Sequence, residues 1–242
     1  MRFYCRHWYS FNLLVAGVLA IALAFNWNRL FFTQQMVALN LLFLFIHQFE
    51  EYGWPGGEPA IMNVLLQQSD IPERFPLNQF SAMITNVVCA MVLYGLPFFF
   101  PNTMWLCLAP MLFNVLQLFI HGVATNVKLK GLYNPGLFAV VFLHMPVTVF
   151  FIYTAVSEQL LSAFDWMGAI LYTLFAGGFF VGIMTYVVFA NRESSWPFAE
   201  EEMERFHLRK KIEQRGIEID TQQPPAGPIA KFQSLQRKLH EK

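Results

Sequence analysis

Charged side chains are scarce in the first 190 residues of this chain. Only 13% of its 242 residues are charged and 56% are hydrophobic, whereas about 25% of the residues of an ordinary soluble domain are charged. Ten of the sixteen Lys and Arg residues and nine of the sixteen Asp and Glu residues follow Ala190. This shortage excludes an ordinary soluble domain before Ala190, and it makes each charged group there informative.

Paired cysteines, glycine-rich loops and basic faces are also missing. The three cysteines, Cys5, Cys89 and Cys107, lie in or beside apolar segments, without the spacing of a disulfide framework or a zinc finger. No glycine-rich phosphate loop occurs, and no basic face with interleaved aromatic residues indicates a nucleic-acid partner. The lipid bilayer is therefore the partner that the sequence predicts most directly.

Long apolar runs dominate the chain up to Ala190. A helix needs about 20 mostly apolar residues to cross the hydrocarbon core of a bilayer. Six windows reach or approach this length, at residues 9–25, 35–51, 79–100, 103–122, 136–156 and 166–190. We predict an all-α membrane protein whose transmembrane domain, residues 1–190, is a bundle of about six transmembrane helices.

Basic residues in the flanks predict the orientation of this bundle. With the N-terminus inside, the inner flanks hold Arg2, Arg6, Arg74, Lys128 and Lys130, and the outer connections hold only Arg29. Both termini are therefore expected in the cytoplasm, and a bacterial inner membrane is the expected location. A cleaved signal peptide is the alternative for the first window, since Arg2 and Arg6 precede it and Ala22-Leu-Ala24 resembles a cleavage site.

The charged tail, residues 191–242, is expected to be cytoplasmic and partly helical. Ser194 or Ser195 could cap a helix with Pro197 near its first position, and acidic residues come early in it and basic residues late, before Gly216. Residues 222–228 indicate a flexible linker. The mixed charge of the tail identifies no particular soluble partner.

Polar side chains nevertheless lie inside four of the windows at similar depth. The second window has His47, Glu50 and Glu51 on one face, because their spacing is i, i+3 and i+4. The other members are Thr85 and Asn86 in the third window, Asn114, Gln117 and His121 in the fourth, and His144 in the fifth. Ionisable groups inside a membrane cost at least a few kcal/mol each by insertion scales, so this agreement in depth indicates one shared site near the cytoplasmic side.

Each residue also has an interpretation without chemistry. Glu50 and Glu51 at a helix end could meet headgroup water. A single histidine such as His47 could be a hydrogen-bonded core residue, and Asn114 could join helices without any further role.

Three motifs in this cluster carry a family resemblance. They are His47-Gln-Phe-Glu50-Glu51, which reads HxxEE, Tyr133-Asn-Pro135-Gly136, which reads YxPG, and Gln117 four positions before His121, where the family has Asn. In these motifs the chain resembles the HXXEE-motif family of membrane proteins, over about residues 10–190. The resemblance implies that His47, Glu50, Glu51, His121, Tyr133 and Pro135 lie in or near a site, and the family has no assigned activity.

Imidazole and carboxylate groups are the ligands that zinc and iron prefer. We therefore predict a metal ion, zinc or alternatively iron, bound by His47, Glu50, His121 and His144. Glu51, with Glu50 as a second catalytic carboxylate, would act as general base, and Tyr133 or Asn114 would steady a developing oxyanion.

The best interpretation of such a site is a metal-dependent hydrolase that cleaves an amide or ester of a lipid or a membrane peptide. One alternative is an iron-dependent lipid oxidoreductase. The other is a protein without catalysis, either a proton-coupled transporter or a structural membrane protein with buried His–Glu pairs. Bound metal separates the first two from the third, and the identity of the metal separates the first from the second.

Overall fold

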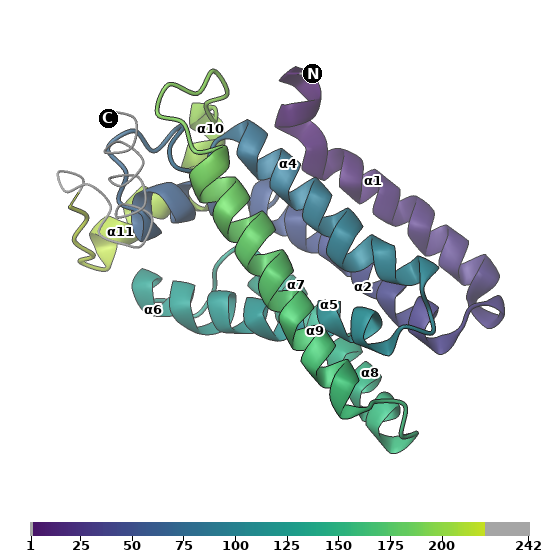
Figure 1. Cartoon of the computed structure of the whole chain (residues 1–242). Helices are drawn as coiled ribbons and strands as arrows, with labels where there is room; N and C mark the ends of the chain where they lie inside the picture. The colour runs from purple at the N-terminus through teal and green to yellow at the C-terminus, as the bar shows by residue number, and fades with distance from the viewer. Residues whose placement is uncertain (1, 221–242) are drawn as a thin grey trace, which may run out of the picture.

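The computed structural model of the chain describes residues 2–220, and within this range it contains helices and no strands. Five helical rods are long and apolar enough to cross a membrane: Arg2–Arg29, Gln79–Phe99, Met104–Leu129, Leu137–Ser157 and Ala163–Val188. The described chain is therefore an all-helical protein with the features of a multi-pass membrane protein (Figure 1).

The rods combine α-helical and π-helical segments. The α-helices of the bundle are α1 (Arg2–Asn26), α2 (Phe32–Tyr52), α4 (Gln79–Cys89), α5 (Met104–Phe119), α6 (Asn126–Leu129), α7 (Leu137–Ala139), α8 (Met145–Ser157) and α9 (Ala163–Ala176). The π-helical segments η3 (Ala90–Gly95), η5 (Ile120–Thr125), η6 (Val140–His144) and η7 (Gly177–Val188) extend or join them. The rod Met104–Leu129 thus continues past residue 122, where we expected this span to end.

The helix α2 is the one predicted span that is not among these five rods. It has the length of a span, but Asn40, His47 and other polar residues lower its hydropathy. Thirteen of its residues are buried, because α1, α5 and α8 pack around it. A helix that its neighbours shield in this way needs no continuous apolar surface of its own.

Side-chain caps explain where two of the long rods begin. The Asn78 side chain accepts a hydrogen bond from the Ser81 backbone N–H at 3.0 Å, and the Ser81 hydroxyl accepts one from the Asn78 N–H at 3.0 Å. Ser162 and Asp165 form the equivalent pair at the start of α9. Such reciprocal caps satisfy donors that a helix start otherwise leaves unpaired.

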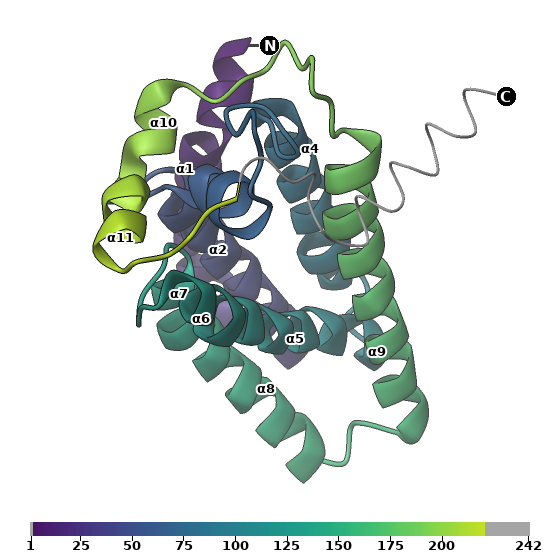
Figure 2. The same ribbon diagram turned by 90° about the vertical axis from the view of Figure 1, so that its left-hand side faces the viewer.

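We call the end of the bundle where α2 ends and α4 begins the site end. The segment between them folds into α3 (Glu58–Ala60) and η2 (Ile61–Leu66). After the last rod, the chain returns over this end as α10 (Glu200–Glu204), the short turn Arg205–His207 and α11 (Leu208–Gln214), as Figure 2 shows beside the first turns of α1. A hydrophobic core that is separate from the one between the rods joins these parts. Its buried members include Trp8, Ile61, Leu65, Met203 and Leu208.

The tail differs from the sequence-based expectation. Its first helix begins at Glu200, not after Ser194 or Ser195, because the Glu202 carboxylate accepts from the Ala199 backbone N–H at 2.7 Å. The helix then breaks at Phe206, whose φ of +63° is incompatible with a right-handed helix. The predicted linker at 222–228 lies outside the described residues.

Candidate metal centre

Three buried side chains meet at the site end of the bundle. The Nε2 atoms of His47 and His121 each lie 3.3 Å from the same oxygen, Oε1 of Glu51. One ligand atom from each of the three residues lies within 4.8 Å of the other two. Two imidazoles and a carboxylate at this spacing are a donor set that could hold a metal ion.

The hydrogen bonds of the two imidazoles define where their protons are. His47 Nδ1 lies 3.1 Å from the carbonyl oxygen of Gly136, which can only accept. His121 Nδ1 lies 2.7 Å from Oδ1 of Asn134. The Asn134 amide nitrogen donates to the His121 carbonyl at 2.7 Å and to Asn126, which leaves Oδ1 as the acceptor. Both Nδ1 atoms therefore carry a proton.

These bonds make Nε2 the atom with the free lone pair in each neutral imidazole. The Gln117 amide nitrogen lies 3.4 Å from His47 Nε2 and is placed to donate to that lone pair. Glu51 Oε1 also carries lone pairs, so each 3.3 Å contact requires either a proton on Nε2, as in a buried His–Glu ion pair, or a metal cation between the two atoms. The donor chemistry thus fits a metal ion, with both imidazoles held by outer hydrogen bonds.

The turn before α7 positions these imidazoles. Gly136 has φ of +96°, in the region that favours glycine. A Cβ atom at this position would lie 2.7 Å from Cε1 of His121 and 2.8 Å from Cε1 of His47. Both rings therefore pack against a backbone surface that only glycine leaves open.

Glu50 has a different environment from the one that we predicted. Its carboxylate accepts from the Tyr133 hydroxyl at 2.8 Å and from the backbone N–H groups of Phe138, at 3.1 Å, and Ala139, at 2.8 Å. The two backbone donors belong to the start of the rod Leu137–Ser157, which Tyr133 precedes, so Glu50 satisfies that helix start from the side. The structure does not bring Glu50 into the group formed by His47, Glu51 and His121.

The Tyr133 side chain contacts Glu50, which itself lies outside the group formed by His47, Glu51 and His121. Its hydroxyl donates to Glu50, and burial together with this carboxylate raises the pKa of Tyr133 well above its usual value. The hydroxyl therefore stays protonated and occupied with Glu50. An oxyanion contact, as predicted for Tyr133, would require this hydrogen bond to break.

His144 and Asn114 form a separate buried network. His144 Nδ1 lies 2.6 Å from Oδ1 of Asn40, and the Asn114 amide donates to the same oxygen at 2.9 Å and to Thr148 at 3.0 Å. The remaining Asn114 oxygen accepts from the Tyr94 hydroxyl at 3.0 Å. The predicted metal ligand His144 and the predicted oxyanion donor Asn114 thus have partners elsewhere, and neither lines the cavity described next.

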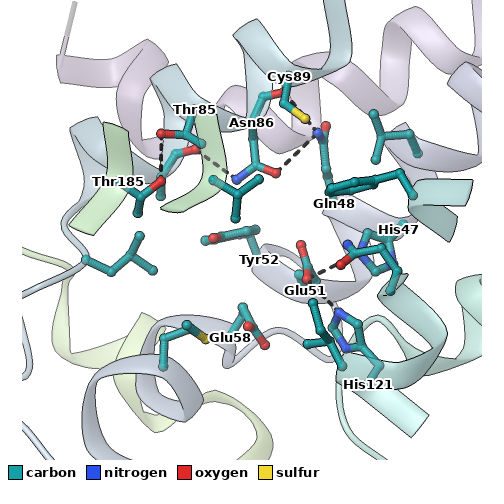
Figure 3. A pocket seen from close by; sticks show the side chains of 18 of the residues that line it. His47, Gln48, Glu51, Tyr52, Glu58, Thr85, Asn86, Cys89, His121 and Thr185 are labelled. Atoms are coloured by element: carbon teal, nitrogen blue, oxygen red, sulfur yellow. Dashed lines mark hydrogen bonds and ion pairs between the residues drawn. The ribbon is translucent and has the colours of Figure 1, made fainter. Parts of the chain in front are cut away.

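A cavity of about 250 Å³ adjoins the three converging residues. Its polar wall includes His47, Glu51, His121, Tyr52 and Glu58 (Figure 3). Its remaining wall is largely apolar and includes Leu44, Phe113, Ile120 and Val181. The cavity can therefore take a molecule with one polar and one apolar part.

Comparison with known proteins gives a family for the central part of the chain. Residues 38–151 match the model of a family described as a protein of unknown function with HXXEE motif. This stretch belongs to the HXXEE family. The HXXEE region contains all three motifs that carried the resemblance, although it is shorter than the 10–190 that we expected. No curated protein and no solved structure matches the chain.

Two residues of the HXXEE region that matter here escaped the sequence analysis. Asn134 lies between Tyr133 and Pro135, inside the YxPG motif, at the position that the motif leaves open. Glu58 lies in a loop after Gly56 and Gly57, where no helical periodicity points to its side chain. Only the folded chain places these two residues beside His121 and the cavity.

Proposed function

We propose that the protein is a metal-dependent membrane hydrolase whose metal ion is bound by His47, Glu51 and His121. The observation that carries this proposal is the contact of two imidazole Nε2 atoms with one carboxylate oxygen, in a geometry where both Nδ1 protons point away. A divalent cation between these atoms would take the place of protons on the two Nε2 atoms and make the three side chains a ligand set. Zinc suits two imidazoles, one carboxylate and an open position for water.

This arrangement changes the role proposed for Glu51. Its Oε1 atom is shared by both imidazoles, which is the position of a ligand rather than of a base that faces a water molecule. When bound, the ion would polarise a substrate carbonyl and favour ionisation of water near neutral pH. The Gly136 carbonyl and Asn134 would hold the two imidazoles in their metal-binding orientation through Nδ1, and the Gln117 amide would have to release His47 Nε2 to the ion.

The shape of the cavity supports a substrate with an apolar part. Phe113, Ile120 and Val181 are among its apolar lining residues. An ester or amide of a lipid, or of a membrane peptide, would place its polar group at Glu51 and its apolar part along these side chains. Burial of the apolar part would stabilise binding by about 25 cal/mol for each Å² removed from water.

Elemental analysis of protein purified in detergent without chelator tests the metal centre. We expect close to one zinc ion per chain in the wild type and almost none in Glu51→Gln, His47→Ala and His121→Ala, because each change removes one ligand. His144→Ala is the matched control, since His144 is an equally buried histidine that pairs with Asn40 instead.

The control variant makes the outcome decisive. Zinc lost from His144→Ala as completely as from His121→Ala would contradict the three-residue site. Wild-type protein that binds neither zinc nor iron, even after incubation with either, would instead support a proton-relay or structural role for the His–Glu cluster.

One observation also favours the iron-dependent alternative. Two histidines and one carboxylate, with other positions open, are the ligand set of non-haem iron oxygenases. His47, His121 and Glu51 provide the same donor types. Iron in place of zinc in the same analysis, together with oxygen consumption in the presence of lipid, would select this function over hydrolysis.

A further inference from the structure

We propose that Glu58 is the general base of the site, and that its free carboxylate oxygen accepts the proton of the water molecule that attacks the substrate. This inference rests on the proposed hydrolase function and adds a residue outside the three family motifs. It follows from where the Glu58 side chain lies, what its oxygen atoms contact and what the other carboxylates of the site already bind.

The Glu58 carboxyl group is buried without a full set of partners. The residue is 9% exposed and lines the same cavity as His47, Glu51 and His121. Its Oε2 atom is buried and has no hydrogen-bond partner within residues 2–220. A buried oxygen without a partner costs about 1–3 kcal/mol, so a water molecule or a ligand group in the cavity is its natural partner.

The other two carboxylates of the site are occupied. Glu51 Oε1 contacts both imidazoles, and Glu50 accepts three hydrogen bonds from Tyr133 and from the start of the rod Leu137–Ser157. Glu58 is outside the group whose ligand atoms lie within 4.8 Å of one another, so it is not a member of the proposed ligand set. In the view of Figure 3, Glu51 is drawn above Glu58 and His121.

The backbone before Glu58 is closely packed against the returning tail. Gly57 has φ of +103°, and a Cβ atom there would lie 2.8 Å from Cβ of Phe206 and 2.9 Å from the Arg205 carbonyl oxygen. The turn Arg205–His207 thus presses against the two glycines that precede α3. A general base must be held in place to act, and this contact supplies the support.

The charged and titratable groups around Glu58 suit a proton acceptor. In the metal-free protein, burial and the negative charge of Glu51 together raise the pKa of Glu58 to about 8, against an opposing effect of His121. Tyr52 and Tyr186 are the other titratable groups that interact with Glu58. A carboxylate whose pKa is close to the working pH both accepts and returns a proton efficiently.

The reaction balances with water as the only co-reactant. Glu58 Oε2 accepts one proton from the water, whose oxygen bonds to the carbonyl carbon of an ester. The bond between that carbon and the alcohol oxygen breaks, and the proton on Glu58 passes to the departing alkoxide. The products are one acid and one alcohol, and Glu58 is again ionised.

The test compares Glu58→Gln with Glu73→Gln in the zinc-loaded and cobalt-loaded protein. Glu73 is a half-exposed carboxylate of the same connecting segment that pairs with Arg74. We expect Glu58→Gln to keep one metal ion per chain and to lower kcat for the p-nitrophenyl ester of lauric acid at least about 100-fold, with little change in KM. The visible absorption bands of bound cobalt should shift in Glu58→Gln and stay unchanged in Glu73→Gln.

The outcomes separate this proposal from the metal site itself. Metal lost from Glu58→Gln would make Glu58 a ligand and overturn its role as base, as would metal retained with unchanged kcat and unchanged cobalt bands. Wild-type protein without bound metal would overturn the metal centre and the role of Glu58 together. If Glu58→Gln fails to fold, Glu58→Asp serves instead: it keeps the charge but withdraws the carboxylate, so kcat should fall while the metal stays bound.

Discussion

At the scale of single residues, the two imidazoles depend on neighbours that take no part in chemistry. His121 is oriented by Asn134, which is itself held by the His121 carbonyl and by Asn126. His47 is oriented by a backbone carbonyl that no side-chain substitution removes. A substitution of a neighbouring residue should therefore change the orientation of His121 more easily than that of His47.

Asn134→Ala is expected to weaken metal binding without removing a ligand. Loss of the Nδ1 partner frees the His121 ring and its tautomer, and loss of such partners typically lowers metal affinity 10–100-fold. Competition with a chelator measures this change, and Asn102→Ala, at an exposed position in the turn between two rods, is the control. An unchanged affinity in Asn134→Ala would show that His121 does not need this hydrogen bond.

Glu58 should make the stability of the metal-free protein depend on pH. Its pKa in the folded protein, about 8, is above the ordinary value of 4.5, so the fold favours the protonated form. The contribution to stability is complete below pH 4.5 and is lost as pH rises toward 8. Glu58→Gln cannot ionise and therefore does not lose this stability. The free energy of unfolding of the variant minus that of the wild type should increase between pH 4.5 and pH 8, by an amount on the order of a few kcal/mol.

Thermal unfolding of metal-free wild type and Glu58→Gln at several pH values measures this gain. The difference in melting temperature should grow from pH 5 to pH 8 and level off above it. A difference that is the same at all these pH values would mean that Glu58 ionises at an ordinary pH and meets solvent in the folded protein.

The residue scale is also where prediction from the sequence reached its limit. The HxxEE spacing predicts that His47, Glu50 and Glu51 share a helix face, and all three are buried at the end of α2. Spacing alone could not separate the two carboxylates, because Glu50 and Glu51 differ by 100° around the helix and meet different neighbours. Only the packing of the bundle determines that Glu50 contacts the rod Leu137–Ser157 and that Glu51 contacts the imidazoles.

At the scale of elements, Glu50 joins the end of α2 to the start of α7. Its carboxylate replaces the side-chain cap that this helix start lacks within its own sequence, because residue 136 is glycine. The same tie fixes the turn that carries Asn134 and Gly136. A residue chosen from the sequence as a metal ligand thus contributes by holding the element that orients both histidines.

Glu50→Gln and Glu51→Gln are therefore expected to change different properties, the first the stability of the fold and the second the binding of the metal. Glu50→Gln removes one charged acceptor from two backbone donors, which should lower the free energy of unfolding by about 1–3 kcal/mol while metal stays bound. Glu51→Gln should abolish metal binding. Thermal unfolding and metal content of both variants provide the measurements, and complete loss of metal from Glu50→Gln would return Glu50 to the ligand set.

Helix positions were predictable where composition decides them. Five of the six predicted windows correspond to long apolar rods, because a run of apolar residues has few other stable states in a membrane. The folded segment between α2 and α4 and the break at Phe206 were not predictable, since both depend on contacts between distant parts of the chain. Asn63, for example, donates to the carbonyls of Pro72 and Leu77 from inside that segment.

At the scale of the whole molecule, the returning tail connects the last rod to the first. Arg205 donates to the Tyr9 hydroxyl at 3.2 Å and to the Tyr52 carbonyl, and its side chain lies against Gly56. Arg215 donates to the Leu129 carbonyl at 2.8 Å. The tail is thus tied to α1, to the end of α2 and to the rod Met104–Leu129 at the site end.

Arg205→Ala should loosen this attachment. Loss of charged hydrogen bonds worth about 1.5–3 kcal/mol lowers the cost of local opening, so backbone amides in 198–214 should exchange at least about 10-fold faster. Hydrogen exchange followed by mass spectrometry measures the rate. Arg209→Ala is the control, because Arg209 is mostly exposed and pairs only with Glu204 among the interactions found for it. Equal rates in both variants would contradict a specific role for Arg205.

The absence of a side chain at Gly136 offers a way to recognise distant relatives of this site. Acidic and histidine residues can change places among helices and still bind a cation, whereas two imidazoles packed on one α-carbon tolerate no added atom at that carbon. A distant sequence with the HxxEE spacing but a larger residue at the position of Gly136 would have to hold its histidines apart. For sorting such sequences, this glycine is therefore more discriminating than either glutamate.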